Sequence, residues 1–129
     1  MVAQVTFEEI VWLHALALAE GGGAPGLRDV GLLESALGRM NAGYGGQELY
    51  RDPVEKAAAL LDALVRNHPF VDGNKRTALA AAATLLDMNG IELSFTPEDA
   101  VALTVGIAKH EVSLGEIVAW LRGHEVGAG

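Results

Sequence analysis

The sequence predicts an all-α fold, a compact bundle of about six helices around a buried central helix. Half of the 129 residues are apolar, and they recur at helical spacing in several segments that begin with helix-capping residues. Residues 91–95, IELSF, have the composition of a short extended piece, but one strand makes no sheet. A chain of this length is expected to form a single domain, 1–129, with a frayed tail over 123–129.

The N-terminal third contains the signals of two helices. Thr6 and Glu9 have the spacing of a capping box, which predicts a helix start there. We expect this helix to end near residue 19, before the glycines of EGGGAPG. A second helix is expected over residues 29–40, where leucines recur at helical spacing. The glycine-rich stretch NAGYGGQELY that follows is expected to be a surface loop.

Four more helices are expected in the rest of the chain. Asp52 and Pro53 predict a cap and a first helical position, and this helix should end near residue 67 because Pro69 disfavours helical geometry just before it. The next helix, residues 73–89, is apolar nearly all round, and we expect it to be the buried central helix. The last two helices are expected near residues 97–109 and 113–122.

Composition excludes several classes of protein. The chain has no cysteine, so it has neither disulfides nor a thiolate metal site. Its first ten residues do not resemble a signal peptide, and no uncharged apolar run approaches the roughly 18 residues of a membrane span. The expected location is therefore the cytoplasm. The net charge of −8 argues against a nucleic-acid-binding surface, which needs a basic footprint.

The positive charges are concentrated in one segment. Residues 51–76 hold five of the nine Lys and Arg against four acids, a balance of +1, whereas the remaining chain has four bases against thirteen acids, a balance of −9. A small anion is therefore a better candidate ligand than a polyanion.

The stretch NHPFVDGNKRT, residues 67–77, lies between two apolar helical segments. Lys75 and Arg76 would occupy the first turn of a helix, where free amides and the helix dipole disfavour cations. The pattern is explained if amides, Lys75 and Arg76 converge on a bound anion. In that case, replacing either cation should leave the empty protein at least as stable.

Two further side chains in this stretch have the chemistry of a phosphate-processing site. Asp72 is a hard oxygen ligand suited to Mg²⁺, which prefers one or two carboxylates together with substrate phosphates. His68 is the natural general base. Each residue alone has a simpler interpretation, in which Asp72 caps the helix and His68 is a structural turn histidine. The concentration of five such residues in ten positions favours the functional interpretation. They are His68, Asp72, Asn74, Lys75 and Arg76.

The segment HPFVDGNKR resembles the signature of the Fic and death-on-curing (Doc) superfamily. The resemblance extends to RDVGLLESAL, KAAALLDALVRNHPF and TALAAAATLLDMNG, and thus covers nearly the whole chain. Fic enzymes that transfer AMP have a glycine at the position of Lys75 and a second arginine at the position of Leu79. This chain departs from those enzymes at both positions, and both departures match Doc toxins.

The resemblance implies a Doc-like toxin of a toxin–antitoxin system. Such an enzyme would transfer a phosphoryl group from ATP, with Mg²⁺, to a protein hydroxyl, in this family a threonine of elongation factor Tu, and so arrest translation. AMP transfer, or a non-catalytic partner-binding protein of the same fold, remain the alternatives. The implied roles are His68 as the base, Asp72 as the Mg²⁺ ligand, Asn74, Lys75 and Arg76 as phosphate ligands, Gly73 as a point of close backbone approach, and Phe70 as the anchor of the loop.

The resemblance also implies a protein partner. The sequence lacks the segment that inhibits some Fic proteins in cis, so restraint would come from a small, DNA-binding antitoxin whose C-terminal helix lies in a groove of the toxin. No direct contact with nucleic acid or membrane is expected.

The other histidines and the tryptophans are weaker candidates for a functional site. His14 within the first helix is expected to be structural, and Trp12 and Trp120 are expected to belong to the core or to an interface. His110 and His124 lack partners at metal-ligand spacing, so we expect no zinc site.

Overall fold

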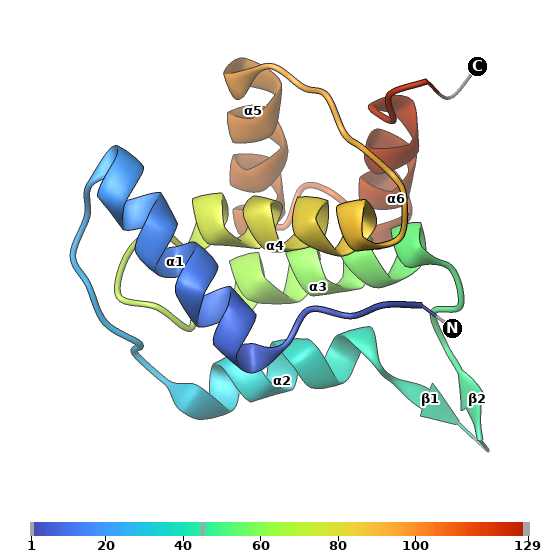
Figure 1. Cartoon of the computed structure of the whole chain (residues 1–129), viewed down its shortest axis with the longest axis horizontal. Helices are drawn as coiled ribbons and strands as arrows, with labels where there is room; N and C mark the ends of the chain where they lie inside the picture. The colour runs from blue at the N-terminus through green and yellow to red at the C-terminus, as the bar shows by residue number, and fades with distance from the viewer. Residues whose placement is uncertain (1, 45, 128–129) are drawn as a thin grey trace.

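The structure, a computed structural model, describes residues 2–44 and 46–127, and in these residues it confirms the all-α prediction (Figure 1). None of the described helices is long and apolar enough to cross a bilayer. The elements are α1 (Phe7–Gly21), α2 (Val30–Met40), β1 (Gly43–Tyr44), β2 (Gln47–Glu48), α3 (Pro53–Asn67), α4 (Asn74–Met88), α5 (Pro97–Ala108) and α6 (Leu114–Gly123).

Each helix begins within one residue of the position that the sequence predicted, and Thr6 and Asp52 cap α1 and α3 as expected. Each cap side chain accepts a hydrogen bond from a backbone amide in the first turn, which satisfies one of the free donors at the helix start. The helix ends are less well predicted: α1 continues to Gly21, two residues beyond the expected end. Capping boxes join Thr6 to Glu9, Asp52 to Glu55 and Ser113 to Glu116, while Asp29 and Thr96 cap α2 and α5.

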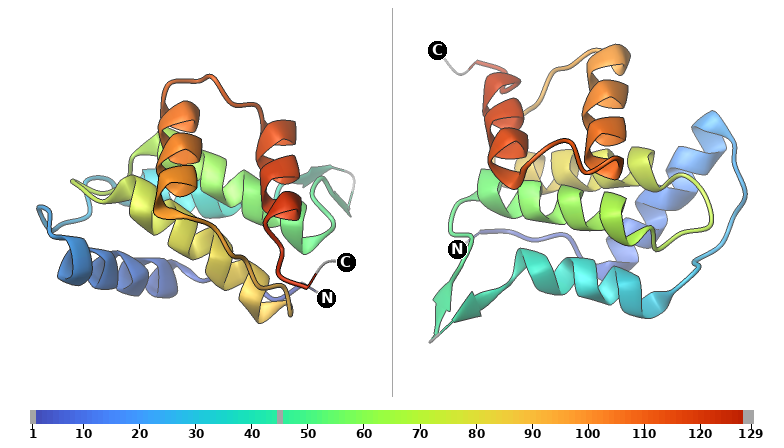
Figure 2. Two further views of the ribbon diagram at one scale, coloured as in Figure 1. Left: turned by 90° about the horizontal axis from the view of Figure 1, so that it is seen from above. Right: turned by 180° about the vertical axis from the view of Figure 1, so that it is seen from behind.

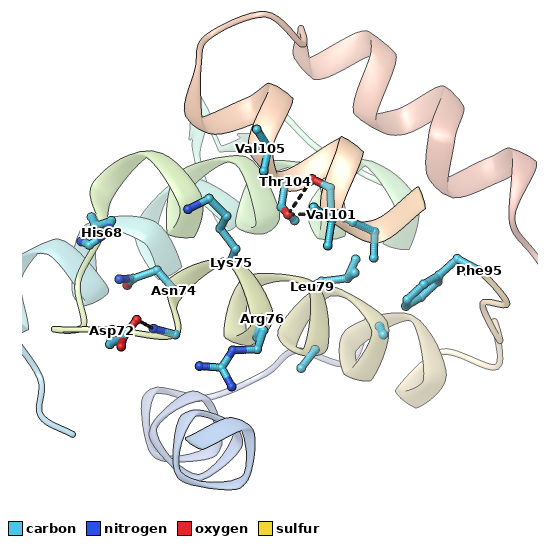
Figure 3. Close-up of a pocket in the computed structure, with 14 residues that line it drawn as sticks. His68, Asp72, Asn74, Lys75, Arg76, Leu79, Phe95, Val101, Thr104 and Val105 are labelled. Carbon is cyan, nitrogen blue, oxygen red and sulfur yellow. Dashed lines mark hydrogen bonds between the residues drawn. The ribbon is translucent and has the colours of Figure 1, made fainter. Parts of the chain in front are cut away.

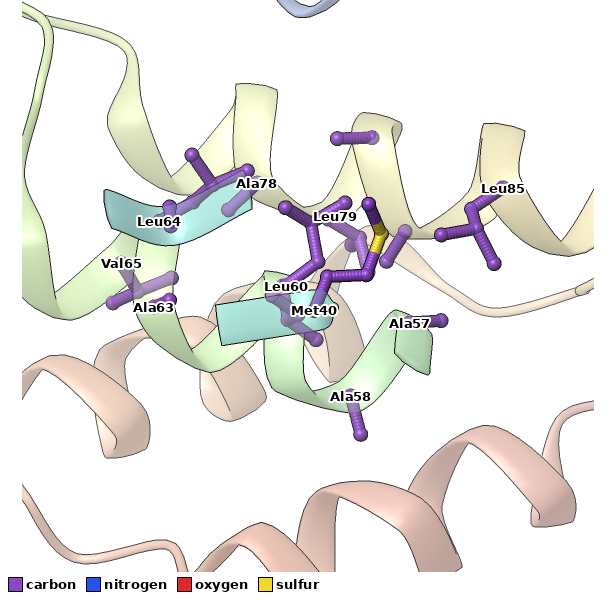
Figure 4. Close-up of a cluster of buried hydrophobic side chains, with 14 of the residues drawn as sticks. Met40, Ala57, Ala58, Leu60, Ala63, Leu64, Val65, Ala78, Leu79 and Leu85 are labelled. Atoms are coloured by element: carbon purple, nitrogen blue, oxygen red, sulfur yellow. The ribbon is translucent and has the colours of Figure 1, made fainter. Parts of the chain in front are cut away.

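The most buried helix is α3 rather than α4, which corrects the sequence-based expectation. All of residues 56–65 are buried, and α3 packs against α2, α4, α5 and α6 (Figure 4). Two charged residues in α3 made this helix look less buried than α4 in the sequence. Lys56 pairs with Glu48 at 3.0 Å, and Asp62 accepts hydrogen bonds from two arginines that cover it. Paired charges can be buried, so apolar content alone was a poor guide.

The glycine-rich stretch after α2 forms a short hairpin rather than the expected loop. Gly43 pairs with Glu48 across the two antiparallel strands. A β-carbon at Gly43 would collide with the carbonyl of Gln47, so glycine is required for this close approach. The buried Lys56 fixes the hairpin to α3 through Glu48.

The segments before α5 and after α6 run side by side. Leu93 and Glu125 form an isolated bridge, and the amide of Val126 donates to the carbonyl of Glu92 at 2.8 Å. The tail that was expected to fray is therefore hydrogen-bonded as far as Val126, and residues 128–129 lie outside the described part of the chain.

Two features of this architecture position the site. The helices α3 and α4 are joined by a short turn, and the segment between α1 and α2 passes beside that turn in each view (Figures 1 and 2). The helix α5 packs on α4 and on α3. The start of α4 is thus enclosed by α1 and its following segment on one side and by α5 on the other.

Candidate active site

The turn between α3 and α4 has left-handed backbone at both ends. His68 follows the last residue of α3 with φ 54° and ψ 55°, and Gly73 precedes α4 with φ 76° and ψ 16°. Gly73 has no side chain with which to cap α4. Asp72 does not replace it, because its carboxylate accepts instead from the amides of Gly73 and Ala24. The interpretation of Asp72 as a simple helix cap is therefore wrong.

A pocket of about 520 Å³ opens at this turn (Figure 3). One end is polar and contains His68 and residues 72–76. The other end is an apolar wall between α4 and α5. Such a pocket has room for a phosphate group at the polar end and an apolar ligand surface beyond it. The wall consists of Leu79, Ala80, Ala83, Phe95, Ala100, Val101, Thr104 and Val105.

Asp72 presents an ionised carboxylate at the polar end. Its Oδ1 accepts from the amide of Gly73 at 2.8 Å, and its Oδ2 accepts from the amide of Ala24 at 3.2 Å. These two hydrogen bonds, with the charge of Arg76 as a smaller contribution, hold the pKa of Asp72 below its usual value. An exposed, ionised carboxylate at the polar end of this pocket has the chemistry of a Mg²⁺ ligand, because Mg²⁺ takes few protein ligands and completes its shell with phosphate oxygens and water.

The two adjacent cations point in different directions. Lys75 is exposed and lines the pocket, whereas the guanidinium of Arg76 turns toward α1. Its Nη1 donates to the carbonyl of Ala17 at 2.8 Å and its Nη2 to that of Gly22 at 2.7 Å. The last turn of α1 contains no basic residue, so Arg76 supplies the cation that stabilises this end of the helix. A phosphate-binding role for Arg76 stays a prediction.

These contacts predict different effects of the two cations on stability, and for Arg76 they replace the expectation from the sequence that its removal leaves the empty protein at least as stable. We expect Arg76→Gln to lower the free energy of unfolding of the empty protein by about 1–2 kcal/mol, because two charge-assisted hydrogen bonds are lost. Lys75→Gln should leave it unchanged or slightly raise it, because a cation leaves the positive end of the α4 dipole. Thermal melts of both variants measure the difference. Equal destabilisation by the two replacements would contradict it.

A comparison of Lys75→Gln with the wild type also tests ligand binding. Wild-type protein should gain stability from Mg-ATP by mass action. Lys75→Gln should gain less, and a full ligand-induced shift in this variant would show that Lys75 does not bind the nucleotide.

Phe70 and Asn74 hold the turn from inside. Phe70 is 1% exposed, and its amide and carbonyl each form a 2.9 Å hydrogen bond with the side chain of Asn74. This structure therefore uses the Asn74 amide to close the turn, and its expected role as a phosphate ligand stays a prediction. The Phe70 ring stacks on His14 with ring centroids 3.9 Å apart.

Comparisons with known proteins identify the family of this chain. The model described as "Fic/DOC family" matches residues 4–86. The chain belongs to the Fic/DOC family. It is 44% identical to "Toxin Doc" of Mycolicibacterium smegmatis over 109 residues, 83% of this chain and 84% of that protein. It is 40% identical to "Protein kinase doc" of Escherichia phage P1 over 115 residues, 89% of this chain and 90% of that protein.

Within this Fic/DOC chain, sequence reasoning missed the residues that support the signature from α1. His14 is 5% exposed, and its Nε2 donates to the carbonyl of Asp72 at 2.8 Å. His14 is thus structural, as expected, but the structure it supports is the turn that carries the signature motif. No sequence signal could connect two residues separated by 58 positions.

The two tryptophans of the Fic/DOC chain behave differently. Trp12 is 61% exposed, so it does not belong to the core, and its alternative assignment to an interface stays a prediction. Trp120 packs partly buried against the core and stacks on His124. Both residues lie on helices with apolar neighbours, and only the packing partners distinguish them.

Proposed function

We propose that this chain is a Doc-like toxin that transfers the γ-phosphoryl group of ATP to a hydroxyl group of a protein. The observation that carries the proposal is that His68, Asp72 and Lys75 open on one pocket at an uncapped helix start. The names of the two relatives support a toxin and a kinase. The residues at positions 75 and 79 also follow the Doc pattern rather than that of AMP-transferring Fic enzymes.

The reaction needs positioning and charge neutralisation more than covalent chemistry. His68 accepts the proton of the attacking hydroxyl while its oxygen bonds to the γ-phosphorus. Lys75 and the free amides at the start of α4 stabilise the negative charge on the transferred group. Asp72 would hold Mg²⁺, which neutralises phosphate charge and orients the nucleotide. ADP leaves as the bond between the γ-phosphorus and the bridging oxygen breaks.

A pair of labelled nucleotides tests the reaction. We expect label from γ-³²P-ATP, and none from α-³²P-ATP, on elongation factor Tu incubated with the protein and Mg²⁺, detected after gel electrophoresis. Reactions with EDTA and reactions without elongation factor Tu serve as controls. Transfer of the α-label would instead establish AMP transfer. If neither label is transferred to elongation factor Tu or to the proteins of a bacterial lysate, the alternative of a non-catalytic binding protein is favoured.

The proposed partners follow from the same family. Elongation factor Tu is the proposed target, modified on a threonine, which places the activity in the cytoplasm and makes arrest of translation its consequence. A small antitoxin, itself DNA-binding, is the proposed regulator, with its C-terminal helix in a groove of this chain. Exposed apolar side chains at the pocket, Val101 at 60% and Phe95 at 36%, support a helix-binding surface.

A further inference from the structure

The segment RDVGLLESAL begins with a residue that the proposed chemistry does not use. Arg28 lies between α1 and α2, and it is absent from the lining of the pocket. It nevertheless donates hydrogen bonds to three successive carbonyls of the catalytic turn. Its Nη2 donates to Asn67 at 3.1 Å, its Nε to His68 at 2.9 Å, and its backbone amide to Pro69 at 2.7 Å.

The first two carbonyls lie at the C-terminal end of α3. Carbonyls in the last turn of a helix lack intrahelical partners and carry partial negative charge. A guanidinium group presents its donors in a rigid planar fork, so one side chain can fix two neighbouring carbonyls in a defined orientation. Arg28 thus constrains the peptide units on both sides of the His68 α-carbon.

The backbone of His68 requires such a constraint. A residue with a β-carbon rarely adopts the left-handed conformation that His68 has, and such conformations persist only where the surroundings enforce them. The direction of the imidazole follows from the backbone that carries it. If the residue relaxed to a right-handed or extended conformation, its β-carbon would move and the ring would leave its place in the pocket.

The backbone around Arg28 anchors the turn independently of its side chain. Asp29 donates to Pro69 at 3.1 Å, Val71 donates to Gly26 at 3.0 Å, and Leu27 bridges to Phe70. Removal of the guanidinium should therefore leave the turn attached and free only the peptide units of Asn67 and His68. This separation makes a selective effect on His68 measurable.

We propose that Arg28 is a positioning residue that holds His68 in the orientation needed for catalysis. The proposal rests on the proposed function, because it assumes that His68 acts as the base. It assigns to Arg28 an effect on the rate of the chemical step and none on the binding of ATP, which it does not touch.

The test compares Arg28→Met, which keeps an unbranched apolar chain, with Arg28→Lys, which restores a charge and a donor without the fork. Arg122→Met is the matched control, because Arg122 is exposed and makes one ion pair, with Asp52 at 3.1 Å, away from the turn. Steady-state phosphoryl transfer gives kcat and KM for ATP. Backbone chemical shifts of His68 from NMR report its conformation whether or not the protein is active.

We expect Arg28→Met to lower kcat on the order of tenfold to a hundredfold, with KM for ATP within about twofold of wild type. The His68 shifts should move away from left-handed values, Arg28→Lys should recover part of both changes, and Arg122→Met should match wild type. Unchanged His68 shifts in Arg28→Met, or a wild-type kcat, would overturn the proposal. So would a rise in KM equal to the loss in kcat.

Two further outcomes distinguish a failure of this proposal from misfolding of the variant and from a failure of the proposed function. If Arg28→Met does not fold, Arg28→Lys decides, and wild-type shifts and kcat in that variant overturn the proposal. Lack of transfer by the wild type would refute the proposed function. In that case the NMR shifts alone decide whether Arg28 holds the His68 backbone, and unchanged shifts overturn that role as well.

Discussion

His68→Ala should slow phosphoryl transfer by roughly 10²–10⁴-fold, the contribution of a positioned general base. The melting temperature should stay close to wild type, because His68 is exposed and exposed substitutions usually change stability by no more than about 0.5 kcal/mol. Binding of Mg-ATP should also persist, since Asp72 and Lys75 are unchanged. Rates with γ-³²P-ATP, thermal melts and a nucleotide titration measure the three quantities.

The chain contains a matched control for this replacement. His110 is also an exposed histidine with left-handed backbone, φ 61°, just beyond the end of α5, and it lies outside the pocket. His110→Ala therefore repeats the chemical change and the backbone setting without touching the site, and its rate should match wild type. A rate for His68→Ala within a few-fold of that for His110→Ala would remove His68 from the mechanism.

Phe70→Ala should lower the free energy of unfolding by about 3–5 kcal/mol, the usual cost of truncating a buried phenylalanine. The ring is 1% exposed and stacks on His14, so truncation leaves a cavity between α1 and the turn. Because a loss of this size is a large fraction of the stability of a small domain, the folded population should fall measurably on warming. Chemical denaturation at low temperature is the measurement.

Phe95→Ala provides the comparison, since it removes the same ring from a half-exposed place. Phe95 is 36% exposed and packs obliquely on Trp120. Its truncation should cost about 1–2 kcal/mol, in proportion to the smaller apolar area that it buries. If the two variants are equally stable, Phe70 does not anchor the turn as its packing indicates.

The sequence was a good guide to where helices begin, because a cap requires only residues three apart. Thr6 and Glu9 form the capping box that their spacing predicted. The signature motif was equally local, and it led to the correct family. The identity of the most buried helix was not predictable in this way, because the partner that neutralises Lys56 comes from the hairpin.

The different roles of neighbouring residues inside the motif were also beyond sequence reasoning. Lys75 and Arg76 are adjacent and have the same charge, yet Arg76 bonds to carbonyls 54 and 59 positions away. Asn74 has the chemistry of a phosphate ligand, but its amide closes on Phe70. Side-chain direction decides these roles, and direction depends on the neighbours that tertiary structure supplies.

The supports of the turn have a consequence for how the protein is made. Arg28 is joined to a residue 40 positions later, and His14 to one 58 positions later. The ribosome synthesises the N-terminal segments first. The helix α1 and the segment after it therefore leave the ribosome before the residues they contact have been synthesised. Contacts between residues so distant in sequence form slowly because the intervening loop must first close. The turn can therefore take up this arrangement only after α4 has left the exit tunnel. A nascent chain truncated before α3 contains His14 and Arg28 but not the turn to which they bond.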